Sequence, residues 1–188
     1  MSDLTGLRQP LAFASNIGLR LQPPVSRWIL RGGPEVASAA AAAFGIELPA
    51  KACRAAHAQD RAALWLGPDE HLLLAPLAMA AAIEQALEQA LVTVPHSLVD
   101  VSHRQVALEM RGARARTMLS AGCPLNLAED DFPLGACTRT MLGKADIVLW
   151  RNDPETFHLE VWRSFARYVW DFLAEAALDV DPQLESPS

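Results

Sequence analysis

The chain has 188 residues, of which 51% are hydrophobic, and a formal net charge of −6 at pH 7. Such a length is sufficient to bury a core, either as one domain or as two smaller ones. The acidic balance argues against the broad cationic surface that neutralises nucleic-acid phosphates, and no apolar run reaches the roughly 18 residues of a membrane span.

The first half of the chain predicts an extended arm followed by a strand, a helix, two strands and a second helix. Residues 1–26 form the arm, because prolines interrupt them and no hydrophobic period is sustained. The first helix is alanine-rich, begins near Pro34 and ends before Gly45, a typical C-cap residue. In chain order, the predicted elements are 27–31, 35–44, 62–66, 71–74 and 77–91.

The second half predicts a similar order of elements. Residues 106–111 alternate between apolar and other side chains, which is typical of a half-buried strand. A helix, three strands joined by short turns and a long terminal helix follow. These elements are expected at 112–121, 136–142, 146–151, 157–161 and 162–178. Residues 179–188 are acidic and polar with two prolines, and predict a disordered tail.

An internal repeat relates the two halves. Both contain an Arg-Gly step before a helix, and Leu72, Leu74 and Leu87 precede Phe157, Leu159 and Phe172 by 85 positions. We therefore expect an α+β fold of two pseudo-repeated β-α-β-β-α units with antiparallel sheets, the first at 27–94 and the second at 95–178. The alternative is a loose alignment of the kind that any two α+β segments allow.

The sequence contains no recognisable catalytic constellation. It has neither a phosphate-binding glycine loop nor a Gly-x-Ser-x-Gly elbow, and its five histidines show no metal-ligand spacing. Asp100, Ser102 and His103 indicate a strand end or turn with local hydrogen bonds, because strand neighbours point to opposite faces. Residues 129–131 indicate a solvated acidic loop. We expect no catalytic, cofactor-binding or metal-binding residue on this chain.

The cysteines provide the one indication of location. The chain has three, an odd number, and none forms a Cys-x-x-Cys pair. This usage fits buried thiols in a reducing cytoplasm better than a disulfide framework.

The terminal helix is the candidate interaction surface. Its apolar stripe is broadened beyond a single seam by further apolar residues, and aromatic and arginine side chains concentrate at protein interfaces. The stripe consists of Trp162, Phe165, Val169, Phe172 and Ala176, broadened by Trp170, Leu173 and Ala177. Two interpretations remain open, core alone and core plus interface. The candidate interface residues are Trp162, Arg163, Phe165, Arg167, Tyr168 and Trp170.

Several motifs resemble one known family. VDVSHRQVALEMRG at 99–112, DFPLGACTRTMLGKADIVLW and FHLEVWRSFARYVWDFL are similar to the gamma subunit of heterotetrameric sarcosine oxidase, over most of residues 60–178. The resemblance implies an accessory subunit that binds no cofactor and joins alpha, beta and delta subunits. FAD, FMN and NAD are then expected on alpha and beta, and zinc on delta. That complex oxidises sarcosine to glycine with oxygen, releasing hydrogen peroxide, and tetrahydrofolate accepts the one-carbon unit.

A more distant resemblance concerns the fold. Asp100-Val101-Ser102-His103, followed by an apolar strand and a glycine, resembles the aminomethyltransferase folate-binding fold. Those enzymes carry paired aspartates after a hairpin, where this chain has only Asp146. The loss of one carboxylate argues against folate-linked catalysis on this chain. The fold resemblance nevertheless leaves two alternative hypotheses: a stand-alone folate-binding one-carbon-transfer protein that uses Asp146, and a general protein-interaction module.

Overall fold

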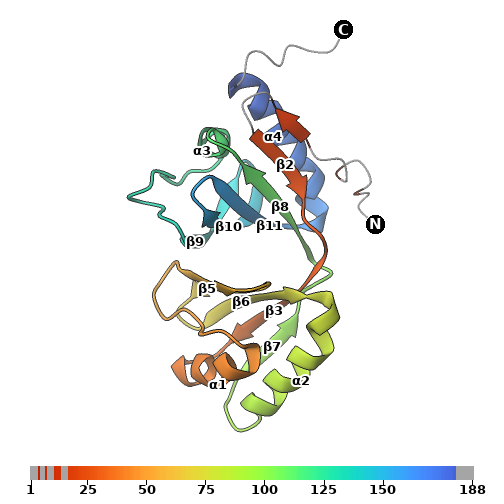
Figure 1. Ribbon diagram of the computed structural model, residues 1–188, viewed down its shortest axis with the longest axis vertical. Coiled ribbons are helices and arrows are strands. Elements are labelled where there is room, and N and C mark those ends of the chain that lie inside the picture. Colours follow the sequence, from red (N-terminus) through yellow and green to blue (C-terminus); the bar gives the residue numbers. More distant parts are fainter. Residues whose placement is uncertain (1–3, 5–6, 8–10, 14–16, 181–188) are drawn as a thin grey trace. The chain divides into compact units, whose positions relative to one another are not determined.

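The computed structural model describes residues 4, 7, 11–13 and 17–180, and divides the chain into two compact units (Figure 1). Unit 1 comprises residues 1–23, 103–134 and 139–188, and unit 2 comprises residues 24–102 and 135–138. Most of the predicted tail, residues 181–188, and part of the predicted arm lie outside the described residues. Among the described residues, no helix is long and apolar enough to cross a membrane.

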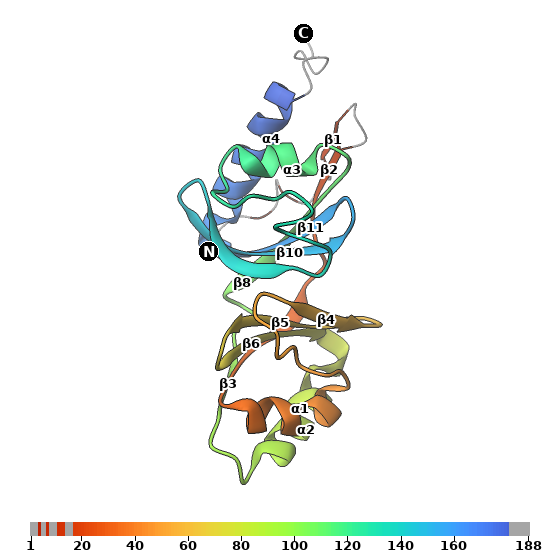
Figure 2. The same ribbon diagram turned by 90° about the vertical axis from the view of Figure 1, so that its left-hand side faces the viewer.

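Unit 2 is a five-stranded antiparallel sheet with two helices on one face (Figure 2). The strand order is β4 (Ala55–Ala58), β5 (Arg61–Gly67), β6 (Glu70–Pro76), β3 (Val25–Arg31) and β7 (Ser97–Asp100). A short 3-10 turn, η2 (Leu77–Met79), joins β6 to α2. Side chains from the sheet and from α1 (Pro34–Phe44) and α2 (Ala80–Leu91) form the core, among them Trp28, Phe44, Leu73, Ile83 and Leu87.

The first helix has the boundaries that its sequence predicts. α1 begins at Pro34, where a missing N–H removes no helical hydrogen bond. It ends at Gly45, which has φ +84° and donates its N–H to the Ala41 carbonyl at 2.8 Å. A glycine suits this left-handed position because it has no Cβ.

Replacing Gly45 by alanine is expected to lower the free energy of unfolding by about 1–2 kcal/mol, the usual cost of a left-handed non-glycine residue. An added Cβ would also lie 2.6 Å from Nη1 of Arg61. Gly67→Ala is the matched control, because its φ is not in the left-handed range and its nearest atom would lie 3.7 Å away. Urea unfolding measures both. Equal losses in the two variants would contradict the assigned role of Gly45.

Unit 1 contains a six-stranded sheet and two helices (Figure 1). The order is β1 (Leu11–Phe13), β2 (Ile17–Leu21), β8 (Gln105–Arg111), β11 (Thr156–Trp162), β10 (Ala145–Asp153) and β9 (Cys137–Leu142). The helices α3 (Ala115–Ser120) and α4 (Ala166–Val180) lie on the same side of this sheet (Figure 2), and the 3-10 turn η3 (Arg163–Phe165) precedes α4. The predicted α+β class with antiparallel sheets is confirmed.

From β3 and from β8 onward, each half of the chain follows the order strand, helix, three strands, 3-10 turn and helix. The second half has the three consecutive strands that its sequence predicts, whereas the first half has one strand more than predicted. The missed strand of the first half is β4. The last strand and the last helix of the two halves lie 86 positions apart, not 85: β6 begins at Glu70 and β11 at Thr156, and α2 begins at Ala80 and α4 at Ala166. A one-residue error exchanges the two faces of a strand, so Leu73, and not Leu74, corresponds to Leu159.

Each half of the chain contributes one strand to the sheet that contains the helix-flanking strands of the other half. β2 precedes β3 in the chain but pairs with β8, whereas β7 precedes β8 but pairs with β3. Residues 17–21, predicted as part of an arm, therefore form a strand inside the unit 1 sheet. Residues 97–100, predicted to open the second unit at residue 95, lie in the sheet of unit 2.

Candidate protein–protein interface

The predicted interface residues lie where the last strand of the unit 1 sheet leads into its long helix. β11 ends at Trp162, which lies opposite Gln105 of β8. The backbone pairing continues by one further bond, because Arg163 donates its N–H to the Arg104 carbonyl at 2.9 Å. This pairing holds the turn before β8 beside the start of η3.

Three of the predicted aromatic residues are exposed, and we call them the aromatic surface: Trp162, Phe165 and Tyr168, with exposed fractions of 46%, 42% and 37%. They follow one another at intervals of three residues. In a 3-10 turn residues three apart lie on the same side, and in an α-helix they are neighbours. An aromatic side chain has about 150–250 Å² of surface to bury in all. A partner could cover the part of it that is still exposed on each of these three residues.

Trp170 does not belong to this surface, in contrast to the prediction. It is 4% exposed, because two helical steps place it about 200° around the helix from Tyr168. The predicted stripe also joined exposed and buried residues, since the 3-10 turn before α4 has three residues per turn and shifts the period. The buried side of α4 consists of Ala166, Val169, Trp170, Leu173, Ala176 and Ala177.

Intramolecular contacts hold the aromatic surface in place. The guanidinium carbon of Arg104 lies 5.2 Å from the ring centroid of Trp162, within the range of a cation–π interaction. The hydroxyl of Tyr168 accepts a hydrogen bond from the N–H of Lys144 at 3.1 Å. The Tyr168 ring centroid also lies 6.2 Å from that of Phe172. Side chains fixed in this way lose less conformational entropy when a partner binds.

The other predicted interface residues, Arg163 and Arg167, flank the aromatic surface. Arg163 donates from Nε to the His103 carbonyl at 3.2 Å. Arg167 donates from Nε to both carboxylate oxygens of Asp171, at 2.9 and 2.7 Å. Both partners of this second pair are more than half exposed, so its contribution to stability is about 0–1 kcal/mol.

The cluster at the end of β7 forms a turn, as predicted. The Asp100 carboxylate accepts the N–H of Ser102 at 2.7 Å, and the Ser102 hydroxyl accepts the N–H of Arg27 at 2.9 Å. The serine oxygen is thus engaged with the backbone. Its contacts are those of a side chain that stabilises local structure.

The acidic segment also makes local contacts. The Asp131 carboxylate accepts a hydrogen bond from the amide of Asn126, and Glu129 lies 3.9 Å from Arg151. Over the part of the chain that the structure describes, no group of three or more histidine, cysteine, aspartate or glutamate side chains is placed to hold a metal ion.

The buried thiol of Cys137 is poorly suited to act as a nucleophile. Burial raises its pKa from 9.0 to about 12, and its Sγ lies 3.5 Å from the Trp65 carbonyl, to which the thiol donates. The thiolate is the reactive form of cysteine, and at neutral pH this group stays protonated. Asp146, on which the folate alternative depends, is exposed near the start of β10.

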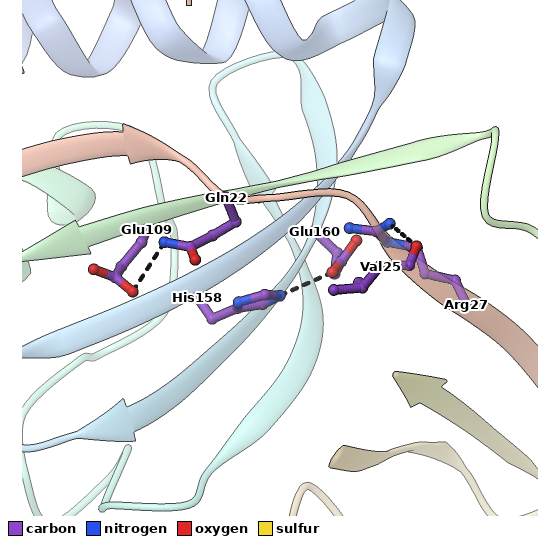
Figure 3. Close-up of polar contacts among 6 residues, drawn as sticks. All are labelled: Gln22, Val25, Arg27, Glu109, His158 and Glu160. Carbon is purple, nitrogen blue, oxygen red and sulfur yellow. Dashed lines mark hydrogen bonds and ion pairs between the residues drawn. The ribbon is translucent and has the colours of Figure 1, made fainter. Parts of the chain in front are cut away.

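Several polar side chains of unit 1 form hydrogen bonds and ion pairs, among them Gln22, which directly follows β2, Glu109 of β8, and His158 and Glu160 of β11 (Figure 3). The Glu109 carboxylate forms an ion pair with Nε of Arg20 at 2.8 Å and accepts a hydrogen bond from Nε2 of Gln22 at 3.0 Å. On β11, Nε2 of His158 lies 2.8 Å from the carboxylate of Glu160. The two contacts of Glu109 connect β2 and the residue after it to β8, and so support the pairing of these strands, whereas the His158–Glu160 contact lies within β11.

Comparisons of the sequence and of the structure with known proteins indicate the same family. The model of the sarcosine oxidase gamma subunit family matches residues 31–179. A sarcosine oxidase subunit gamma from Arthrobacter is 31% identical over 167 residues, which cover 88% of this chain and 77% of the relative. The heterotetrameric sarcosine oxidase of Corynebacterium sp. U-96, solved with pyrrole 2-carboxylate, contains a chain that superposes with a TM-score of 0.86 and 26% identity. This superposition covers 98% of our chain and 95% of the other.

A second solved structure is similar in fold. The glycine cleavage system aminomethyltransferase T of Bartonella henselae superposes with a TM-score of 0.64 at 16% identity, covering 85% of this chain and 45% of that one. At this identity the likeness concerns the fold alone. It confirms the fold relationship that the residues around Asp100 indicate.

Proposed function

The chain belongs to the sarcosine oxidase gamma subunit family, and we propose that it is a non-catalytic accessory subunit of a heterotetrameric sarcosine oxidase. The extent of the structural match supports this proposal. Nearly the whole chain, 98%, superposes on a chain of a solved heterotetrameric sarcosine oxidase. A stand-alone role would leave that correspondence without an explanation.

In this proposal the chemistry resides on partner chains. The partners are alpha, beta and delta subunits, with FAD, FMN and NAD on alpha and beta and zinc on delta. The assembly oxidises sarcosine to glycine with oxygen and yields hydrogen peroxide, and tetrahydrofolate takes up the one-carbon unit when present. A cytoplasmic location, based on the cysteine usage, is part of the same proposal.

The contribution of this chain is to cover and support partner surface. The aromatic surface is where we place a contact, because three large apolar side chains are exposed and already held by internal contacts. Interface positions of this kind dominate binding energy when a partner encloses them. Phe165 is the most informative of the three, since Trp162 and Tyr168 also take part in the internal contacts described above.

Phe165→Glu is expected to weaken incorporation of this chain into the complex at least about tenfold, because a buried unpaired charge replaces an apolar contact. The four subunits are co-expressed, the complex is purified through a tag on another subunit, and subunit stoichiometry is measured by native mass spectrometry.

Val92→Glu is the matched control: Val92 lies at the end of α2 and is 78% exposed. Thermal unfolding of each variant chain reports whether the fold is kept. If the Phe165→Glu variant is incorporated stoichiometrically, the aromatic surface is not part of the interface. Failure of the wild-type chain to co-purify would overturn the proposed function itself.

A further inference from the structure

The aromatic surface lies within a local concentration of positive charge on an acidic chain. Arg104 and Arg163 stand at the Trp162 end, and Arg167 stands beside Tyr168. Of these three guanidinium groups, Arg167 has a carboxylate partner, Asp171. The chain as a whole carries a net charge of −6, so this concentration differs in sign from the average of the molecule.

Arg104 and Arg163 still have hydrogen-bond donors to offer. Within residues 4, 7, 11–13 and 17–180, neither has a carboxylate oxygen within 4.0 Å. The guanidinium of Arg104 lies over the Trp162 ring, and Arg163 uses Nε for the His103 carbonyl. The terminal nitrogens of both side chains have no hydrogen-bond acceptor in the described part of the chain, and these nitrogens form the planar fork that binds a carboxylate through two bonds.

The backbone fixes the relative positions of these two arginines. The Arg163 N–H donates to the Arg104 carbonyl at 2.9 Å, directly after the β8–β11 ladder. The two side chains therefore start from paired positions, and the ring of Trp162 supports one of them. Charged donors that are positioned before binding lose little entropy when they engage an acceptor.

We propose that Arg104 and Arg163, together with the aromatic surface, receive an acidic segment of a partner subunit. This segment carries at least one aspartate or glutamate carboxylate beside an apolar side chain. The carboxylate bonds to the two guanidinium groups, and the apolar side chain packs on Phe165. The proposal rests on the proposed function, which supplies the complex to which the partner belongs.

The composition of the surface favours a protein carboxylate over a polyanion. Binding to nucleic acid neutralises a series of phosphates along an extended cationic surface. Here Arg104 and Arg163, whose terminal nitrogens have no acceptor among the described residues, stand at the Trp162 end of the aromatic surface, on a chain of net charge −6. A pair of carboxylate-binding forks beside an apolar surface is instead the pattern of a protein interface.

The test uses the co-expressed four-subunit complex. Arg104→Glu and Arg163→Glu are each expected to weaken retention of the chain at least about tenfold, because like charges then face each other across the interface. Arg163→Lys keeps the charge but loses the planar fork, and is expected to weaken retention less. Lys51→Glu is the control, because Lys51 is exposed in unit 2 and the variant changes the net charge equally.

Salt dependence provides a second measurement that does not rely on charge reversal. Raising sodium chloride from about 50 to about 500 mM shortens the range of electrostatic attraction. The wild-type complex is expected to lose affinity over this range, and an Arg104→Gln/Arg163→Gln double variant is expected to lose much less.

The outcomes separate this proposal from the proposed function. Dissociation by Phe165→Glu without any effect of the arginine variants or of salt would overturn the acidic partner and leave the accessory role intact. If the wild-type chain does not co-purify with the other subunits, both proposals are overturned. The proposal is supported if the arginine variants are no longer retained in the complex while the melting temperature of each free variant chain is unchanged.

Discussion

Leu19→Ala is expected to lower the free energy of unfolding by about 2–5 kcal/mol, the usual cost of removing a fully buried leucine side chain. Leu19 is 0% exposed and lies opposite Met110, which is also 0% exposed, in the pairing of β2 with β8. The substitution removes apolar side-chain atoms that are buried in the wild type, and it leaves a cavity where they were. Urea denaturation followed by circular dichroism measures it.

Leu21→Ala provides the comparison, because it removes the same atoms from the same strand at a position that is only partly buried. Its cost is expected to be well below that of Leu19→Ala. An arm without a place in the fold would make both substitutions nearly neutral. Equal and small effects would therefore contradict the position of β2 in the unit 1 sheet.

Cutting the chain between residues 94 and 95 is expected to give two fragments that do not fold separately but associate when mixed. The first fragment contains β2 without its partner β8, and β3 without its partner β7. The second fragment contains β8 without its partner β2, and β7 without its partner β3. Unpaired strand edges in each fragment expose backbone groups that the other fragment satisfies.

Fragments 24–94 and 24–102 give a matched pair that differs by one strand. The longer fragment keeps all five strands of the unit 2 sheet, and is expected to show a cooperative urea transition. The shorter one lacks β7 and is expected to unfold at lower urea or to aggregate. Coincident transitions would show that β7 contributes nothing to unit 2, against the pairing of Ile29 with Val99.

Local patterns predicted most helices and strands because their causes lie within a few residues. Pro34 and Gly45 bound α1 through their own backbone preferences. β4 was missed because Ala55–Ala58 consists of small residues around His57, which give no clear period of two. Its pairing with β5 is decided by residues that follow it in the chain.

The internal repeat was predicted from the sequence, but its correct offset was not. Landmarks in the two halves indicated a common architecture, but the offset of 85 was one residue short of the 86 that relates the last strand and the last helix of each half. With the correct offset, Ile83, Leu87 and Leu91 of α2 correspond to Val169, Leu173 and Ala177 of α4, all buried. The burial of these side chains distinguishes the two offsets, and burial depends on the packing of helix on sheet.

The candidate interface was identified from residue types and corrected by packing. Aromatic and arginine residues at the start of the last helix indicated the region. The structure exposes Trp162, Phe165 and Tyr168, which follow one another at intervals of three residues through η3 into α4. It buries Trp170, which lies two helical steps, about 200°, around α4 from Tyr168. Arg104 carried no signal in the sequence, since its proximity to Trp162 arises from pairing between strands far apart in the chain.

The sequence by itself determined the α+β class, the positions of most elements, the related halves and, through its motifs, the family. These properties follow from local periodicity, turn residues and the spacing of residues within short segments. Only the tertiary structure decided that β2 and β7 exchange sheets, and which side of the last helix faces outward. Both depend on hydrogen bonds and burial between segments distant in the chain, which no local pattern records.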